Sequence, residues 1–148
     1  MRALTYLTLG LVVVASAGCS SGDNQVAVRP VTGQVIYDGK PAAGVQVFLV
    51  STNAGRPKGA AINPHAVTGP DGKFEITTYE PGDGAPEGNY KAVLHWPVED
   101  SEAEEPPDRL FGWYDLRHTT LSVKVTNQTS ALDPFKLQAV HGPPPQRA

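Results

Sequence analysis

The residues whose types could support catalysis or metal binding are few and dispersed along the sequence. The four histidines have no spacing typical of metal ligands; they are His65, His95, His118 and His141. The sequence contains no Gly-x-Ser-x-Gly motif, which would present a nucleophilic serine on a strained turn. We therefore expect no catalytic residue, no metal site and no cofactor.

An acidic run in the second half of the chain is a candidate calcium site. It contains Glu99, Asp100, Glu102, Glu104 and Glu105. The run lacks the alternating Asp/Asn pattern that places several oxygen atoms around one ion. We expect it to form a solvated loop.

An aromatic cluster follows this loop and consists of Phe111, Trp113 and Tyr114. If the cluster is exposed, its rings can stack on a sugar or on the surface of a partner. If it is buried, it closes one end of the fold. These three residues are the candidate contacts with a ligand or partner.

The single cysteine, Cys19, comes directly after a segment typical of an export signal. Arg2 supplies a positive charge, an apolar run covers Leu4–Ala15, and small residues precede the cysteine. The run is shorter than the roughly 20 residues that a membrane span needs. We expect residues 1–18 to be a signal peptide and residues 19–27 to be a polar tether.

The end of this segment, Ala17-Gly18-Cys19, resembles the bacterial lipobox, although Ser16 stands where an aliphatic residue is usual. The resemblance implies that the Cys19 thiol receives diacylglycerol, so that acyl chains such as palmitate anchor the protein at the cell envelope. Ser20 favours the outer membrane, facing the periplasm or the exterior. The alternative is ordinary cleavage near Ala17, with Cys19 left as a free thiol in a soluble secreted protein.

Composition and patterning indicate that an all-β domain positions these residues. The chain has 15 glycines and 14 prolines, which punctuate strands, and no sustained helical period follows the signal. Alternating apolar and polar residues predict about seven short strands in a single antiparallel sandwich over residues 28–139, followed by a loose proline-rich tail over 140–148. The clearest segments are Val31–Tyr37, Val45–Leu49, Lys73–Thr78, Gly88–Trp96, Leu121–Thr126 and Phe135–Leu137.

Local signals predict two tight turns and one tyrosine contact. Asp38-Gly39 and Gly69-Pro70-Asp71-Gly72 combine residues that favour turns and positive φ. Tyr90 has the pattern of a corner tyrosine, whose hydroxyl ties a loop to its strand. We expect a structural role for it.

Three segments together resemble the carboxypeptidase regulatory-like domains. They are Val31–Pro41 with Gly44–Val47, Thr68–Phe74 and Glu87–Ala92, and the resemblance spans about residues 28–139. It implies a transthyretin-like (prealbumin-like) Greek-key sandwich. In larger proteins such domains accompany catalytic or adhesive modules, and short bacterial lipoproteins with one such domain are a recognised group.

The resemblance also implies structural roles for Tyr114, Asp115 and Thr119. The zinc carboxypeptidases that carry this domain bind their metal through a His-x-x-Glu pair, which does not occur here. The net charge of −3 and the scattered cations argue against nucleic-acid binding.

We therefore expect a non-enzymatic, membrane-tethered binding or scaffolding module at the cell envelope. Its partner would be an envelope protein or a polysaccharide. The alternatives are a carbohydrate- or peptide-binding accessory protein that uses the aromatic cluster and, less favoured, an unrecognised envelope hydrolase.

Overall fold

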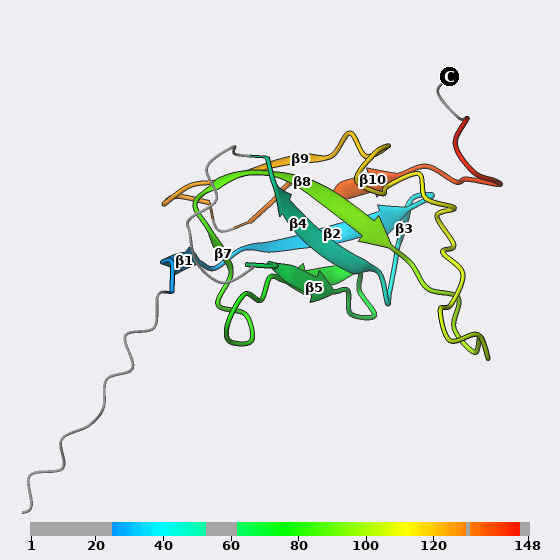
Figure 1. Cartoon of the computed structure of the whole chain (residues 1–148), viewed down its shortest axis with the longest axis horizontal. Helices are drawn as coiled ribbons and strands as arrows, with labels where there is room; N and C mark the ends of the chain where they lie inside the picture. The colour runs from blue at the N-terminus through cyan, green and yellow to red at the C-terminus, as the bar shows by residue number, and fades with distance from the viewer. Residues whose placement is uncertain (1–24, 53–61, 130, 146–148) are drawn as a thin grey trace, which may run out of the picture.

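The computed structural model describes residues 25–52, 62–129 and 131–145. Cys19 and the predicted signal peptide lie outside these residues. The described chain forms ten β-strands and no helix, which confirms the all-β prediction (Figure 1). The strands are β1 (Val28–Arg29), β2 (Thr32–Tyr37), β3 (Lys40–Pro41), β4 (Gln46–Ser51), β5 (His65–Val67), β6 (Lys73–Glu75), β7 (Ala85–Pro86), β8 (Gly88–His95), β9 (Ser122–Val125) and β10 (Phe135–Leu137).

The strands form two four-stranded sheets and one short pair. One sheet has the order β10-β2-β3, with β6 also paired to β2, and the other has the order β5-β4-β8-β9. Strands β1 and β7 form the separate pair. The strand count exceeds the predicted seven because β1, β3 and β7 have only two residues each, too few to produce an alternating pattern.

The prediction of a purely antiparallel fold is wrong for one pair, because β10 runs parallel to β2. The register places Phe135 opposite Val35 and Leu137 opposite Tyr37. Since β9 belongs to one sheet and β10 to the other, the chain passes from one sheet to the other between Val125 and Phe135. Alternation shows which face of a strand is buried but does not show the direction of its neighbour.

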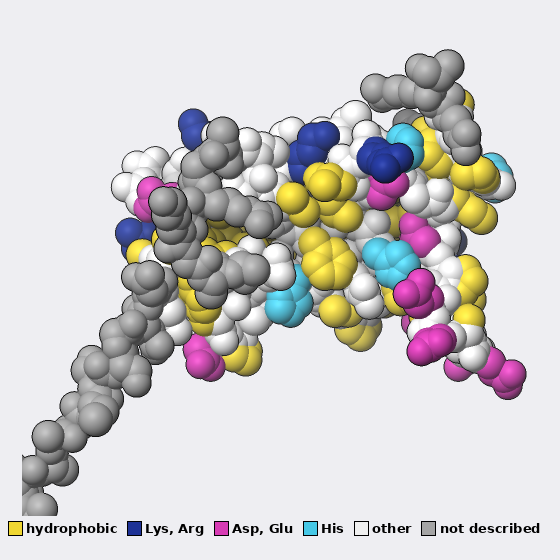
Figure 2. Space-filling model, in the orientation of Figure 1, with side chains coloured by type: hydrophobic (Ala, Val, Ile, Leu, Met, Phe, Trp, Pro, Cys, Tyr) yellow, Lys and Arg dark blue, Asp and Glu magenta, His cyan; other side chains and the backbone are white. Residues whose placement is uncertain are grey.

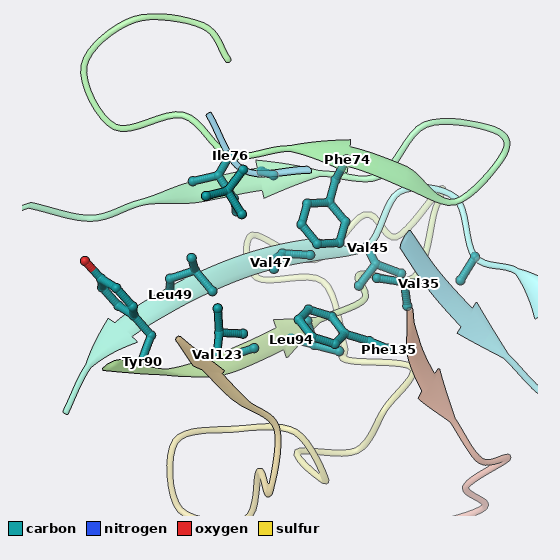
Figure 3. Packing of buried hydrophobic residues seen from close by; sticks show 14 of the residues in the cluster. Val35, Val45, Val47, Leu49, Phe74, Ile76, Tyr90, Leu94, Val123 and Phe135 are labelled. Atoms are coloured by element: carbon teal, nitrogen blue, oxygen red, sulfur yellow. The ribbon is translucent and has the colours of Figure 1, made fainter. Parts of the chain in front are cut away.

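The two sheets share one hydrophobic core, which makes the fold β-sandwich-like. Strand β8 alternates as predicted, with Tyr90, Ala92 and Leu94 buried. Figure 3 shows side chains from both sheets, including Phe74 and Leu94, in a common interior. Each fully buried aliphatic or phenylalanine side chain contributes about 1.5–3 kcal/mol relative to its exposed state.

Both predicted turns are present. Asp38 and Gly39 have φ values of 48° and 76°, as a type I′ hairpin turn between β2 and β3 requires. The amide of Gly72 donates to the carbonyl of Gly69 over 2.8 Å and closes the turn before β6. These local signals are reliable because the φ requirement belongs to the turn residues themselves.

Two further positions in the connections between strands restrict which residue can occupy them. The buried Thr68 hydroxyl donates to the carbonyl of Ala42 over 2.6 Å and accepts from the amide of Val45 over 2.9 Å. Gly84 has a φ of 98° and lies so close to the carbonyl of Arg29 that a Cβ atom would overlap it. These positions therefore demand a small hydroxyl side chain and a glycine, respectively.

Candidate functional site

The predicted aromatic cluster lies on a loop whose start is held by one carboxylate, that of Asp108. Its Oδ1 accepts hydrogen bonds from the amides of Trp96 and Leu110 over 2.9 and 3.0 Å, and its Oδ2 accepts from the amide of Gly112 over 2.9 Å. The Leu110 side chain is fully buried and joins the core. The aromatic loop therefore begins at a fixed point of the sandwich.

The end of the loop is held by Asp115 and Thr119. Asp115 Oδ1 accepts from the amides of Arg117 and His118 and contacts the His118 ring nitrogen Nδ1 at 2.9 Å. Partial burial raises the pKa of Asp115. These hydrogen bonds and the adjacent histidine lower the pKa by more than burial raises it, so that it lies below the ordinary value. The buried Thr119 hydroxyl donates to the carbonyl of Ala92 over 2.7 Å. Both side chains organise backbone, consistent with the structural roles expected from the resemblance.

The three aromatic residues of the cluster have different environments. Phe111 and Trp113 are exposed over 46% and 37% of their surfaces, whereas Tyr114 is partly buried against the core. Phe111 has a φ of 51°, a left-handed conformation that is rare for a bulky residue. Such strain costs on the order of 1–3 kcal/mol and persists only where the surrounding structure enforces it. The loop thus leaves two rings accessible and uses the third for packing.

The exposed Trp113 contacts the C-terminal segment of the chain. Its indole Nε1 donates to the carbonyl of Gly142 over 2.6 Å. Nearby, the Tyr37 hydroxyl accepts a hydrogen bond from the amide of Val140 over 3.1 Å. Side chains of two distant segments therefore bind the backbone of the predicted tail at Val140 and Gly142, whereas Pro143 and Pro145 are exposed. Residues 146–148 lie outside the described part.

Trp96 provides a rigid base for this end of the molecule. Its indole Nε1 donates to the carbonyl of Ala43 over 2.9 Å, and its ring meets Tyr37 edge to face at a centroid distance of 5.2 Å. The guanidinium of Arg109 lies 4.0 Å from the centroid of the Trp96 ring, within the range of a cation–π interaction. The tyrosine that contacts the tail is therefore itself fixed by packing.

An apolar groove on the outer face of the sheet β5-β4-β8-β9 was not predicted from the sequence. It has a volume of about 600 Å³, and its apolar lining includes Phe48, Val50, Val93 and Leu116. Figure 2 shows hydrophobic side chains gathered on this face with histidines on both sides. The signal was present in β4, where Phe48 and Val50 alternate with the buried Val47 and Leu49, so that both faces of the strand are apolar.

The other polar side chains that could support chemistry either make structural hydrogen bonds or are not grouped into a site within the described part of the chain. Tyr90 donates its hydroxyl proton to the carbonyl of Pro86 over 2.7 Å, which confirms the corner-tyrosine prediction, and burial raises its pKa. Asp83 accepts hydrogen bonds from three consecutive amides that begin at Thr78. Among the described residues, no group of three His, Cys, Asp or Glu side chains is arranged to hold a metal ion, and the acidic run is largely exposed.

No protein-family model matches this chain, and no curated protein matches its sequence. Among solved structures, the chain is similar to a 9R-lipoxygenase from Cyanothece PCC8801, with 19% sequence identity and a TM-score of 0.35. The similarity covers 76% of this chain and only 16% of the lipoxygenase chain. It carries no argument about fold or activity. No helix within the described ranges is long and apolar enough to cross a membrane.

Proposed function

We propose that the protein is a membrane-tethered, non-enzymatic binding or scaffolding module of the cell envelope, built on a transthyretin-like Greek-key sandwich. The lipid at Cys19 supplies the anchor, at the outer membrane. The finer fold assignment is supported by the hairpin at Asp38-Gly39 and by the Tyr90 corner contact, because both occur in the segments that carry the family resemblance.

The observation that carries this proposal is the pair of exposed aromatic rings on an otherwise fixed loop. Asp108 and Asp115 hold the backbone on either side of Phe111 and Trp113. Exposed aromatic residues on a rigid support give large contact area at low entropic cost, which is typical of binding surfaces. Strand β1, next to the expected tether, lies at the opposite end of the molecule from the C-terminal segment that contacts Trp113 (Figure 1). In a tethered protein the rings would therefore face away from the membrane.

The experiment that tests the anchor is the intact mass of the full chain purified from its native membrane, beside a Cys19→Ala variant. We expect the wild-type mass to equal residues 19–148 plus acyl groups, and the variant to lack the added mass and to leave the membrane fraction. An unmodified wild-type mass, with the protein in the soluble fraction, would refute the tether. A soluble secreted binder would then replace it.

The contact between Trp113 and Gly142 favours a second, more specific function, that of a carbohydrate- or peptide-binding accessory protein. An indole N–H donates equally well to a sugar hydroxyl and to a peptide carbonyl, and the ring stacks on either ligand. Titration of the full chain with envelope oligosaccharides and with peptides, followed by tryptophan fluorescence, tests this function. A Trp113→Ala variant should lose the response.

A further inference from the structure

We propose that the surface around Trp113 is a docking site for extended, proline-rich peptides, and that the chain's own segment Gly142–Pro145 occupies it. This inference rests on the proposed binding function and specifies the ligand as a peptide. The segment Gly142-Pro143-Pro144-Pro145 is the example of that ligand supplied by the molecule itself.

The tail has the chemistry of a preformed extended ligand. Proline fixes φ near −65° and has no amide proton, so three consecutive prolines favour the polyproline II conformation and cannot extend a sheet. Their carbonyls remain free to accept hydrogen bonds, and little conformational entropy is lost on binding because the segment is already stiff.

The surface has the complementary chemistry. The indole of Trp113 is a donor only, and it donates to the carbonyl of Gly142, the residue immediately before the three prolines, over 2.6 Å. Aromatic side chains that donate to the carbonyls of proline-rich peptides are a recurring mode of recognition. Phe111, two residues away, offers a second exposed ring on the same loop.

A second contact sets where the tail enters the site. The Tyr37 hydroxyl accepts from the amide of Val140, three residues beyond the end of β10. Tyr37 is also the residue opposite Leu137 in the parallel pair, so the end of the sheet directs the chain toward Trp113. The tail contributes no residue to the buried core among the described residues, and Pro143 and Pro145 are exposed. The bound tail is therefore exchangeable without unfolding the domain.

Attachment to the same chain gives the tail a high effective concentration, of the order of millimolar for a short connection. A free peptide must compete with this segment. Removal of the tail should consequently strengthen binding of a peptide added in trans.

The two tryptophan indole N–H signals in a ¹H–¹⁵N NMR spectrum test the proposal. The Trp96 indole, which donates to Ala43, is an internal reference, and a Trp113→Phe variant assigns the two signals. The full chain is compared with a variant in which Pro143, Pro144 and Pro145 are replaced by alanine and with a chain that ends at Ala139. We expect both changes to move the Trp113 signal and to leave the Trp96 signal in place.

A synthetic peptide of residues 138–145 is then added to each protein. We expect saturable return of the Trp113 signal in the chain that ends at Ala139, at least tenfold weaker binding to the intact chain, and at least tenfold weaker binding of a peptide with alanine in place of the three prolines. If the shortened chain fails to fold, the triple-alanine variant of the full chain replaces it as the acceptor.

Three results would overturn the inference: an unmoved Trp113 signal after tail removal, equal binding of the alanine peptide, or saturable binding of an oligosaccharide without binding of the proline peptide. The last result would leave the proposed binding function standing and refute only the peptide ligand. Absence of lipid at Cys19 would refute the tether while leaving the peptide titration unaffected, so the two failures are distinguishable.

Discussion

Replacement of Asp108 should loosen the aromatic loop and lower the stability of the whole domain. The carboxylate accepts three backbone hydrogen bonds of 2.9–3.0 Å, from Trp96 directly after β8 and from Leu110 and Gly112 in the loop. A hydrogen bond to a charged group contributes about 1.5–3 kcal/mol when buried, and less where water can replace it. Because Asp108 is only partly buried, we expect Asp108→Ala to lower the free energy of unfolding by about 3 kcal/mol.

Asp108→Asn distinguishes the contributions of the two carboxylate oxygens to stability. If the amide oxygen takes the place of Oδ1, the hydrogen bonds from Trp96 and Leu110 remain, and the amide nitrogen faces the N–H of Gly112 without an acceptor. We expect a loss of about 1–1.5 kcal/mol, between wild type and Asp108→Ala.

Urea unfolding monitored by circular dichroism measures both variants, with thermal unfolding as a second assay. A loss of about 3 kcal/mol corresponds to a decrease in Tm of roughly 10 °C for a domain of this size. Asp133→Ala is the matched control, because Asp133 is an exposed carboxylate that makes no hydrogen bond within the described chain. If Asp108→Ala and Asp133→Ala unfold at the same urea concentration with the same slope, the carboxylate does not hold the loop and the reasoning is refuted.

Three further predictions concern the contacts that support the fold. Thr68→Val should lower the free energy of unfolding by about 1–3 kcal/mol, because the buried carbonyl and amide that its hydroxyl joins lose their shared partner; an unchanged urea midpoint would contradict this. Gly84→Ala should destabilise the domain by roughly 3 kcal/mol or more, because the added Cβ atom would overlap the carbonyl of Arg29. Gly39 also has positive φ but has open space around it, so Gly39→Ala should cost about 1–2 kcal/mol. Equal unfolding midpoints for the two variants would contradict the packing argument. Burial raises the pKa of Asp83, but three backbone hydrogen bonds lower it below its ordinary value of 3.8 overall. Its contribution to stability is therefore present above that pH and lost as the pH falls through the lowered folded-state pKa, so Tm measured from pH 6 to roughly pH 2 should fall less steeply in Asp83→Asn.

The strands and turns of this protein were largely predictable from the sequence because their signals are local. The alternation around Tyr90 and Leu94 identifies the buried face of β8, and Asp38-Gly39 identifies a hairpin through the φ values that the turn needs. A strand of two residues is too short to show alternation of apolar and polar residues. The alternation in a longer strand is the same whether its neighbour runs parallel or antiparallel. The β1–β7 pair and the direction of β10 therefore depended on the tertiary structure.

For the candidate site, the sequence by itself identified the candidate residues: it singled out the aromatic cluster Phe111, Trp113 and Tyr114 and left open whether the rings are exposed. Only the tertiary structure separated the two accessible rings from Tyr114, because exposure depends on how the loop is held by Asp108 and Asp115. Only it brought Trp113 to Gly142, 29 residues away along the chain. Residue type fixes what a side chain can donate or accept, whereas its partner is decided by the packing of segments that are distant in sequence.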